Sequence, residues 1–183
     1  MRAVTQPEGA APRWRLVLLR HAKAEPGRGV VPDVQRPLAL NGRRQAGRVG
    51  MALTAGRLVP EVALVSSALR TRQTWDLASA HLDGASAVSL QVREELYEAS
   101  VGDVLDLLRT VPASRRTVLV VGHEPTMAAT AAYLADEGSD DAALAQVRVG
   151  VPTATYSVLE STDRPWADWG RSSARLVHVG RPS

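Results

Sequence analysis

Two of the four histidines follow apolar runs of the kind that form buried strands. His21 comes after residues 16–19 and Arg20, and His123 comes after residues 117–121 and Gly122. The carboxyl ends of parallel strands share one rim of a sheet, and ligands of open α/β sheets bind in the crevice outside that rim. The pattern therefore predicts that these two imidazoles meet in space, although about 100 residues separate them.

Several arginines are expected at the same rim. A third strand-like run, residues 62–65, leads directly into Ser66 and then Arg70, while Arg20 precedes the first histidine and Arg36 lies in the loop beyond it. Guanidinium groups form paired hydrogen bonds with phosphate oxygens and stay charged at physiological pH. A rim of this composition predicts a site for a phosphoryl group.

Histidine is a candidate nucleophile for that group. Neutral imidazole forms covalent catalytic intermediates, and its ordinary pKa of about 6.5 leaves a useful neutral fraction at pH 7. The chain has no cysteine, which excludes disulfides, thiolate metal sites and a cysteine nucleophile. A metal held by His21 and His123 is an alternative, but no carboxylate recurs at ligand spacing and the arginines would repel a cation. We therefore expect no metal and no cofactor, and we interpret His81 and His178 as ordinary surface or edge residues.

Strand-like and helix-like segments alternate along most of the chain, which indicates βα units. Strands are predicted over residues 15–20, 62–65, 87–92, 117–121, 146–149, 153–159 and 175–179. Helices are predicted from the candidate N-cap Asn41 to Gly56, after Ser67, from the candidate N-cap Ser100 to Pro112, and from Pro125 onward. We expect an α/β fold with a mainly parallel sheet, helices on both faces and an antiparallel edge at the helix-free end. Residues 162–173 are expected to form a surface loop in which Trp166 and Trp169 serve packing.

Length and composition set further limits. The 183 residues, 45% of them hydrophobic, are enough for one domain, which we place at residues 14–183 after a flexible N-terminal segment, residues 1–13. Net charge is only +3 and aromatic content is 4%, so nucleic-acid binding is not favoured. No apolar segment approaches the roughly 20 residues of a membrane span, and the first 13 residues lack an apolar signal-peptide core. We expect a cytoplasmic protein that binds neither nucleic acid nor membrane.

Three motifs in order resemble those of the histidine phosphatase superfamily. Residues 18–22, LLRHA, resemble its Arg-His-Gly signature, with Ala22 in the place of glycine. Residues 65–74, VSSALRTRQT, resemble its second arginine motif, and residues 121–125, VGHEP, its second histidine motif. The run Arg36-Pro37-Leu38 followed by Gly42 is similar to the small SixA-type phosphohistidine phosphatase branch. The resemblance spans roughly residues 16–158.

The resemblance implies a phosphoglycerate mutase-like fold and a two-step reaction. His21 would accept the phosphoryl group, and water would then release phosphate from it. Arg20 and Arg70 would bind the phosphoryl oxygens and His123 would complete the pocket. Two further residues at the rim are candidate substrate contacts, namely Arg36 and Ser66.

The substrate and the general acid are open at this point. Superfamily members often carry a carboxylic acid that protonates the leaving group, and the candidates here are Glu94, Glu95 and Glu98. An alkoxide benefits from such a donor, whereas imidazole leaving from phosphohistidine is a far weaker base. The poor acid motif and short loops favour a phosphorylated histidine protein over a small molecule such as a nucleotide or phosphorylated metabolite. A mutase is disfavoured by the short chain, and a silent phosphate-binding module by the intact motif residues.

Overall fold

A single six-stranded mixed sheet forms the centre of the molecule, with the strand order β3-β2-β4-β1-β5-β6. The computed structural model describes residues 13–29 and 31–183. The four strands β3, β2, β4 and β1 run parallel, and β5 is antiparallel to both of its neighbours. The strands are β1 (Trp14–Arg20), β2 (Val62–Ser66), β3 (Ser89–Arg93), β4 (Thr117–Gly122), β5 (Tyr156–Ser161) and β6 (Arg175–Gly180). The predicted α/β class, mainly parallel sheet and antiparallel edge are confirmed.

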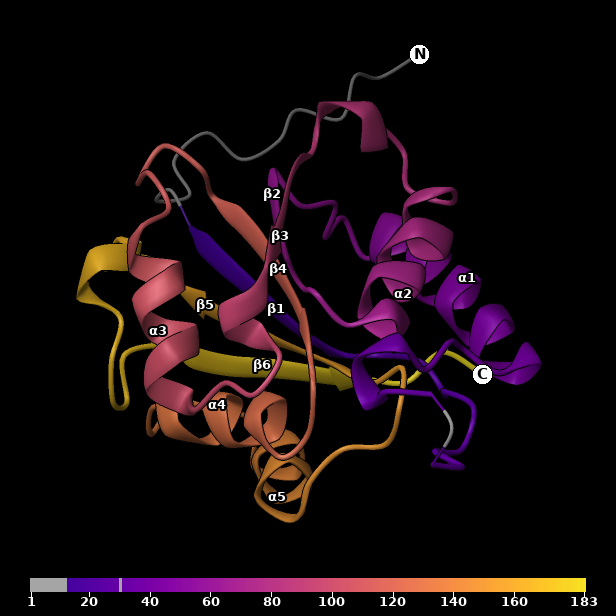
Figure 1. The fold of residues 1–183 in the computed structure, drawn as a ribbon. Coiled ribbons are helices and arrows are strands. Elements are labelled where there is room, and N and C mark those ends of the chain that lie inside the picture. Colours follow the sequence, from indigo (N-terminus) through magenta and orange to yellow (C-terminus); the bar gives the residue numbers. More distant parts are fainter. Residues whose placement is uncertain (1–12, 30) are drawn as a thin grey trace.

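Helices cover both faces of this sheet (Figure 1). Helices α1 and α2 pack on one face, and α3, α4 and α5 pack on the other. The α-helices are α1 (Leu40–Ala55), α2 (Leu69–Ser79), α3 (Val101–Arg109), α4 (Thr126–Leu134) and α5 (Asp141–Val149). Short 3-10 turns are η1 (Asp33–Gln35), η2 (Ala85–Ala87), η3 (Glu94–Leu96) and η4 (Trp166–Asp168).

The central strand β1 shows why its sequence is a continuous apolar run. Leu16 and Leu18 belong to the core beneath α3 and α4, while Val17 and Leu19 belong to the core beneath α1 and α2. Successive side chains of a strand point to opposite faces, so a strand covered on both faces needs apolar residues at every position. This burial fixes the position of the end of β1 and therefore that of His21, the next residue.

Two local predictions are wrong. Residues 146–149 are the end of α5 and not a strand, because Ala143 and Val147 bury one helical face and the Asp140 side chain caps the helix by accepting from the Ala143 N–H. Helix α1 begins at Leu40 with Ala39 as its N-cap, so Asn41 lies inside the helix.

Two predicted strands are present but begin later than expected. Residues 153–155 precede β5, and residue 87 belongs to η2, ahead of β3. Trp166 and Trp169 are buried and pack against each other with ring centroids 4.9 Å apart, as predicted. Of the predicted N-terminal segment, residues 1–12 lie outside the described residues, and Arg13 pairs with Glu160 at 3.0 Å. Across residues 13–29 and 31–183, the helices are too short or too polar to cross a bilayer.

Candidate active site

The carboxyl ends of β1 and β4 bring the two motif histidines together. The strands are parallel neighbours with Arg20 opposite Gly122, and the His21 backbone N–H donates to the Gly122 carbonyl at 3.0 Å. The rings of His21 and His123 lie with centroids 5.3 Å apart and planes tilted by 58°. The prediction that the two imidazoles share one rim of the sheet is confirmed.

His21 is held in one tautomer by its own chain. Its Nδ1 lies 2.7 Å from the Ala22 carbonyl oxygen, which can only accept a hydrogen bond. Nδ1 therefore carries the hydrogen of the neutral ring, and Nε2 keeps a free lone pair. The Ala22 N–H donates in turn to the Thr74 hydroxyl on α2 at 3.0 Å, which fixes the carbonyl that holds the ring.

The surroundings of His21 keep this ring neutral. The side chain is only 8% exposed. Burial, together with the positive charges of Arg70, Arg20 and Arg36, lowers the pKa of His21 to about 4, although the bond to Ala22 opposes that shift. At neutral pH the ring is therefore an unprotonated base with its lone pair on Nε2.

His123 is oriented by two hydrogen bonds. Nδ1 lies 3.3 Å from Nη2 of Arg70, and a guanidinium can only donate, so Nδ1 is the acceptor. Nε2 then carries the hydrogen and donates to the Ser66 hydroxyl at 2.8 Å. Burial and the charge of Arg70 lower the pKa of His123 to about 3. Ser66 is fully buried beneath this ring, so it contacts His123 and not the open pocket.

Arg70 is anchored by Asp33, a residue that the sequence analysis did not identify. Arg70 is only 6% exposed, and its guanidinium donates to the backbone oxygen of Asp33 at 2.9 Å and to its carboxylate at 3.1 Å. The same carboxylate accepts from the Tyr97 hydroxyl at 2.7 Å and from Arg36 at 2.9 Å. These hydrogen bonds, that from Tyr97 foremost, hold the pKa of Asp33 at about 2. Asp33 thus ties two guanidinium groups and the pocket tyrosine into one network.

Two buried N–H groups in the site have no acceptor among the described residues. They are the Nε groups of Arg20 and Arg70. Each guanidinium is anchored elsewhere, Arg70 on Asp33 and Arg20 through Nη1 on the Val151 carbonyl at 2.7 Å. Burial lowers the pKa of Arg20, which the carboxylate of Glu124 opposes. Buried charged donors without an acceptor are costly, and a bound oxyanion would satisfy both. The residues present thus fit a phosphoryl group.

Glu124, the residue after His123, joins the start of α4 to the loop that holds Arg20. One carboxylate oxygen accepts from the Ala128 N–H of α4 at 2.9 Å, and the other accepts from the Val151 N–H at 3.2 Å. Val151 is the residue whose carbonyl holds Arg20. The second histidine motif therefore also positions the arginine of the first.

A cavity of about 350 Å³ opens beside His123, and its wall includes Tyr97, Arg70 and Asp33. Of the three candidate acids only Glu98 lines this cavity. Glu95 instead pairs with Arg93 at 2.9 Å, and Glu94 is exposed on η3 outside the lining.

Two functional side chains were missed, and only one of them left a signal in the sequence. Asp33 stands three residues before Arg36, the spacing of a local ion pair on a helical turn. No local pattern identifies Tyr97. Arg36 itself lies at the site through Asp33 and through a hydrogen bond to the Glu25 carbonyl at 2.8 Å.

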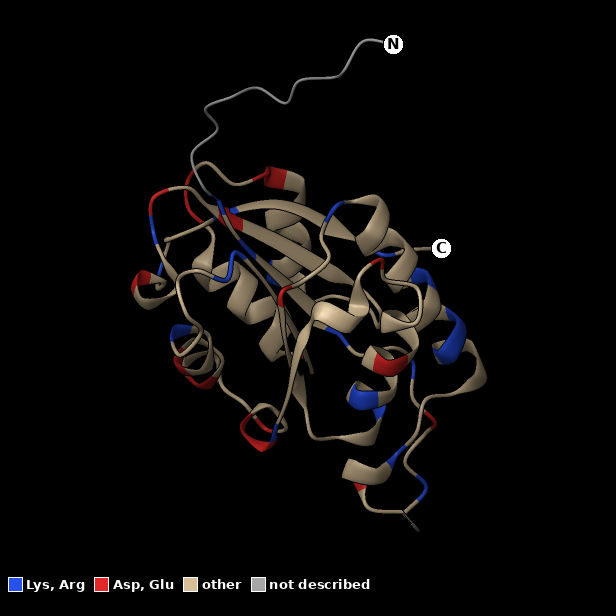
Figure 2. Ribbon diagram, turned by 90° about the horizontal axis from the view of Figure 1, so that it is seen from above, with Lys and Arg blue, Asp and Glu red and all other residues tan. Residues whose placement is uncertain are grey.

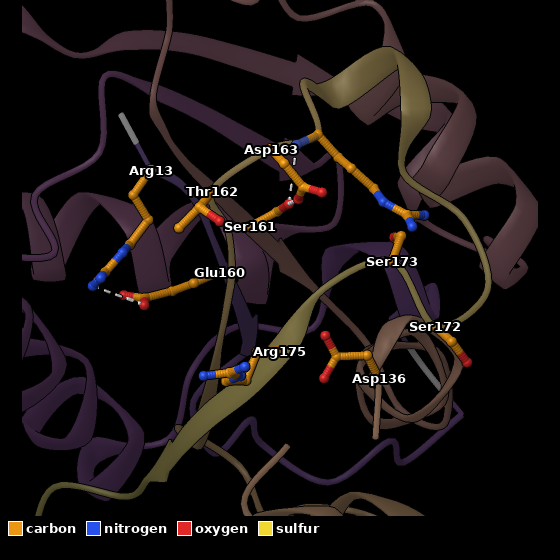
Figure 3. Close-up of a pocket in the computed structure, with 10 residues that line it drawn as sticks. Arg13, Asp136, Glu160, Ser161, Thr162, Asp163, Ser172, Ser173 and Arg175 are labelled. Atoms are coloured by element: carbon orange, nitrogen blue, oxygen red, sulfur yellow. Dashed lines mark hydrogen bonds and ion pairs between the residues drawn. The ribbon is translucent and has the colours of Figure 1, made fainter. Parts of the chain in front are cut away.

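A second cavity, of about 370 Å³, lies at the opposite end of the strands (Figure 3). Arg13 and Glu160 in its wall neutralise each other, and Asp136 and Arg175 add one charge of each sign. It contains no histidine. Of these two cavities, only the one beside His123 has a motif histidine in its wall. Among the described residues, no three His, Asp or Glu side chains gather in a way that would hold a metal ion.

Comparison with known proteins agrees with this geometry. The family described as "Histidine phosphatase superfamily (branch 1)" matches residues 16–113. A Mycobacterium tuberculosis protein of unknown function is 39% identical over 166 residues, which cover 89% of this chain and 100% of that protein. A structure from Nakamurella multipartitia, described as a candidate phosphohistidine phosphatase SixA, is 34% identical with a TM-score of 0.80 and covers 95% of this chain and 99% of its own. The Agrobacterium tumefaciens protein of the same description is 28% identical with a TM-score of 0.75, over 92% and 98% of the two chains.

The matched segment contains the first histidine, both pocket arginines and Asp33, and the structural likeness extends over nearly the whole fold. The chain therefore belongs to the histidine phosphatase superfamily, in its SixA-type branch.

Proposed function

We propose that this phosphatase hydrolyses phosphohistidine through a phosphorylated enzyme intermediate on His21. The observation that carries the proposal is the fixed tautomer of His21, in which the Ala22 carbonyl engages Nδ1 and leaves an unprotonated Nε2 beside two arginines. A neutral nitrogen lone pair next to buried guanidinium groups suits attack on phosphorus.

In the first step the Nε2 lone pair of His21 forms a bond to phosphorus, and the bond from phosphorus to the substrate breaks. The leaving group takes that electron pair and then a proton. The Nε groups of Arg20 and Arg70 donate to the phosphoryl oxygens, over which the negative charge is spread during transfer. His123 supports this step by holding Arg70 through Nδ1.

In the second step a water oxygen attacks the phosphorus of phospho-His21. The bond between phosphorus and Nε2 breaks, its electron pair returns to Nε2, and a water proton passes to solvent as phosphate leaves. The resting tautomer is restored because Nδ1 keeps its hydrogen throughout, donated to the Ala22 carbonyl. No metal ion or cofactor is needed in either step.

The leaving group follows from the weak acid function of the site. Asp33 is held ionised by its three donors, and Glu98, the acid that lines the cavity, is exposed. Imidazole is a weaker base than an alkoxide and departs with less help from an acid. The candidate SixA enzymes among the similar structures are described as phosphohistidine phosphatases, which supports the same substrate.

A small phosphorylated metabolite is the second candidate substrate, because a cavity of about 350 Å³ is within the range that small ligands occupy. A substrate panel distinguishes the two candidates. We expect the highest kcat/KM with a histidine-phosphorylated peptide and lower values with nucleotide and sugar phosphates. The reverse order would identify a metabolite phosphatase, transfer to an added alcohol would identify a mutase, and no turnover at all would leave a phosphate-binding module.

The nucleophile is tested by acid-labile, alkali-stable labelling during turnover. The wild-type protein should carry the label on Nε2 of His21, and His21→Ala should lose both label and activity. His123→Ala should keep detectable label, with a rate about a hundredfold lower if the loss resembles that of an oxyanion donor. A label on His123, or normal turnover by His21→Ala, contradicts the mechanism.

A further inference from the structure

Charge is unevenly divided along this chain. Of the 22 Lys and Arg and the 19 Asp and Glu, residues 20–72 contain ten basic and only three acidic ones, which leaves 12 basic and 16 acidic residues elsewhere. The small net charge therefore conceals a basic segment, residues 20–72, and an acidic remainder of the chain. The basic segment includes α1, which carries blue segments and no red one in Figure 2.

Helix α1 presents three arginines whose charges have no partner within the described part of the chain. Arg43, Arg44 and Arg48 are exposed, and they form no ion pair with any described residue. Arg44 and Arg48 are neighbours at i, i+4, where like charges destabilise a helix. Arg43 and Arg44 also stand in the amino-terminal part of the helix, where the helix dipole disfavours positive charge. Their presence is better explained by a partner than by stability.

Two large apolar side chains share the same exposed face of α1. Leu40 is 67% exposed and Met51 is 51% exposed. The positions 40, 44, 48 and 51 follow helical spacing, so the apolar side chains flank the two arginines along one stripe. We call Leu40, Arg44, Arg48 and Met51 the α1 stripe.

The α1 stripe begins beside the loop that follows the nucleophile. The Ala39 N–H that precedes α1 donates to the Lys23 carbonyl at 2.9 Å, and Lys23 is exposed two residues beyond His21. At Gly42 an added Cβ would stand 1.9 Å from that carbonyl oxygen, so glycine allows the first turn of α1 to lie against the active-site loop. A macromolecule bound along the stripe would reach the pocket mouth.

We infer that the α1 stripe docks an acidic surface of the protein that carries the phosphorylated histidine. This inference rests on the proposed function, whose substrate class it narrows. Arginines interleaved with exposed apolar side chains match a protein surface that offers both carboxylates and apolar contacts. An RNA partner is disfavoured because α1 contains no aromatic side chain for base stacking, and two apolar residues are few for insertion into a membrane.

The test compares two peptides of equal length with one phosphohistidine each, one rich in Asp and Glu and the other rich in Asn and Gln. The wild-type protein should prefer the acidic peptide, and the preference should fall as salt rises, because electrostatic steering is screened. Arg44→Glu/Arg48→Glu should lower kcat/KM for the acidic peptide by about tenfold and leave the turnover of free phosphohistidine unchanged. The milder Arg44→Gln/Arg48→Gln variant should have a kcat/KM for the acidic peptide between those of the wild-type protein and Arg44→Glu/Arg48→Glu.

The matched control is Arg115→Glu/Arg171→Glu, which makes the same charge change near the opposite ends of the strands, where both arginines are exposed. It should retain the wild-type preference. Equal loss in this control, or equal kcat/KM for the two peptides in the wild-type protein, would overturn the inference.

Fluorescence anisotropy with the unphosphorylated acidic peptide separates docking from catalysis. If the wild-type protein binds this peptide and Arg44→Glu/Arg48→Glu does not, the docking surface is supported. A failure to turn over phosphohistidine would contradict the proposed function alone and would leave this binding result standing. Tighter binding to phosphatidylserine vesicles or to single-stranded RNA than to the acidic peptide would refute a protein partner.

Discussion

Acidification should reveal that the folded protein resists protonation of His21. Burial and the neighbouring arginines lower its pKa to about 4, against about 6.5 for an unfolded chain. At pH 6.5 an ordinary imidazole is half protonated, whereas His21 should be protonated in only about 0.3% of molecules. The nucleophile therefore stays available, and kcat/KM should show no loss from His21 until the pH approaches 4.

The same shift predicts a change in stability, whose sign follows from proton binding. The unfolded chain takes up the proton at a higher pH than the folded one, so the contribution of His21 is complete above pH 6.5 and declines as pH falls toward 4. The full shift corresponds to about 3 kcal/mol, of which about 2 kcal/mol should be lost by pH 5. Urea unfolding at pH 8 and pH 5, compared between the wild-type protein and His21→Asn, isolates this amount.

Nitrogen-15 NMR of labelled histidine measures the pKa of His21 directly. The resonance of His21 is identified by its absence from the spectrum of His21→Asn. Arg36→Gln should raise the pKa of His21, since the charge of Arg36 contributes to lowering it. Added phosphate should raise it too, because a bound anion favours the imidazolium. A His21 pKa near 6.5 in phosphate-free buffer, or the same pH dependence of unfolding in both proteins, would refute the account of a buried, neutral nucleophile.

Three shorter predictions concern other parts of the structure. Ser66→Ala should lower kcat and destabilise the protein by about 1–3 kcal/mol, as it leaves the His123 Nε2–H without its acceptor; kinetics and urea unfolding measure the two effects. Gly50→Ala should lower Tm, because its Cβ would stand 2.0 Å from the Ala78 carbonyl oxygen and push α1 away from α2; calorimetry checks this. Activity should survive EDTA, and a loss that zinc or magnesium restores would reinstate a metal site.

The sequence predicted the central strands well because both faces of them are buried. After Thr117, residues 118–121 are all apolar, and β4 lies there with its side chains packed in the cores on both faces of the sheet. The strand prediction for residues 146–149 was wrong because Val147 and Val149 alternate with polar residues, as in a half-buried strand, over a short window. Only the helical spacing from Ala143 to Val147, together with the cap at Asp140, distinguishes the two structures.

The candidate site was predictable where each residue follows a strand end. His21, Ser66 and His123 stand at the ends of β1, β2 and β4, so parallel pairing alone brings them to one rim. Asp33 and Tyr97 follow no such rule. They reach each other from η1 and from the turn after η3, and that meeting depends on the strand order and on the path of two loops.

Glu124 links the two histidine motifs. Its carboxylate accepts from the Val151 N–H, and the carbonyl of that residue accepts from Arg20, so both motifs are hydrogen-bonded to the same loop. Substitutions at Glu124 and at Arg20 should therefore be non-additive in a double-mutant cycle, even though no direct hydrogen bond joins their side chains. A designer who moved the second motif into another scaffold without the loop at residues 150–152 would transfer the histidine. The hydrogen bond that orients the arginine of the first motif would be lost.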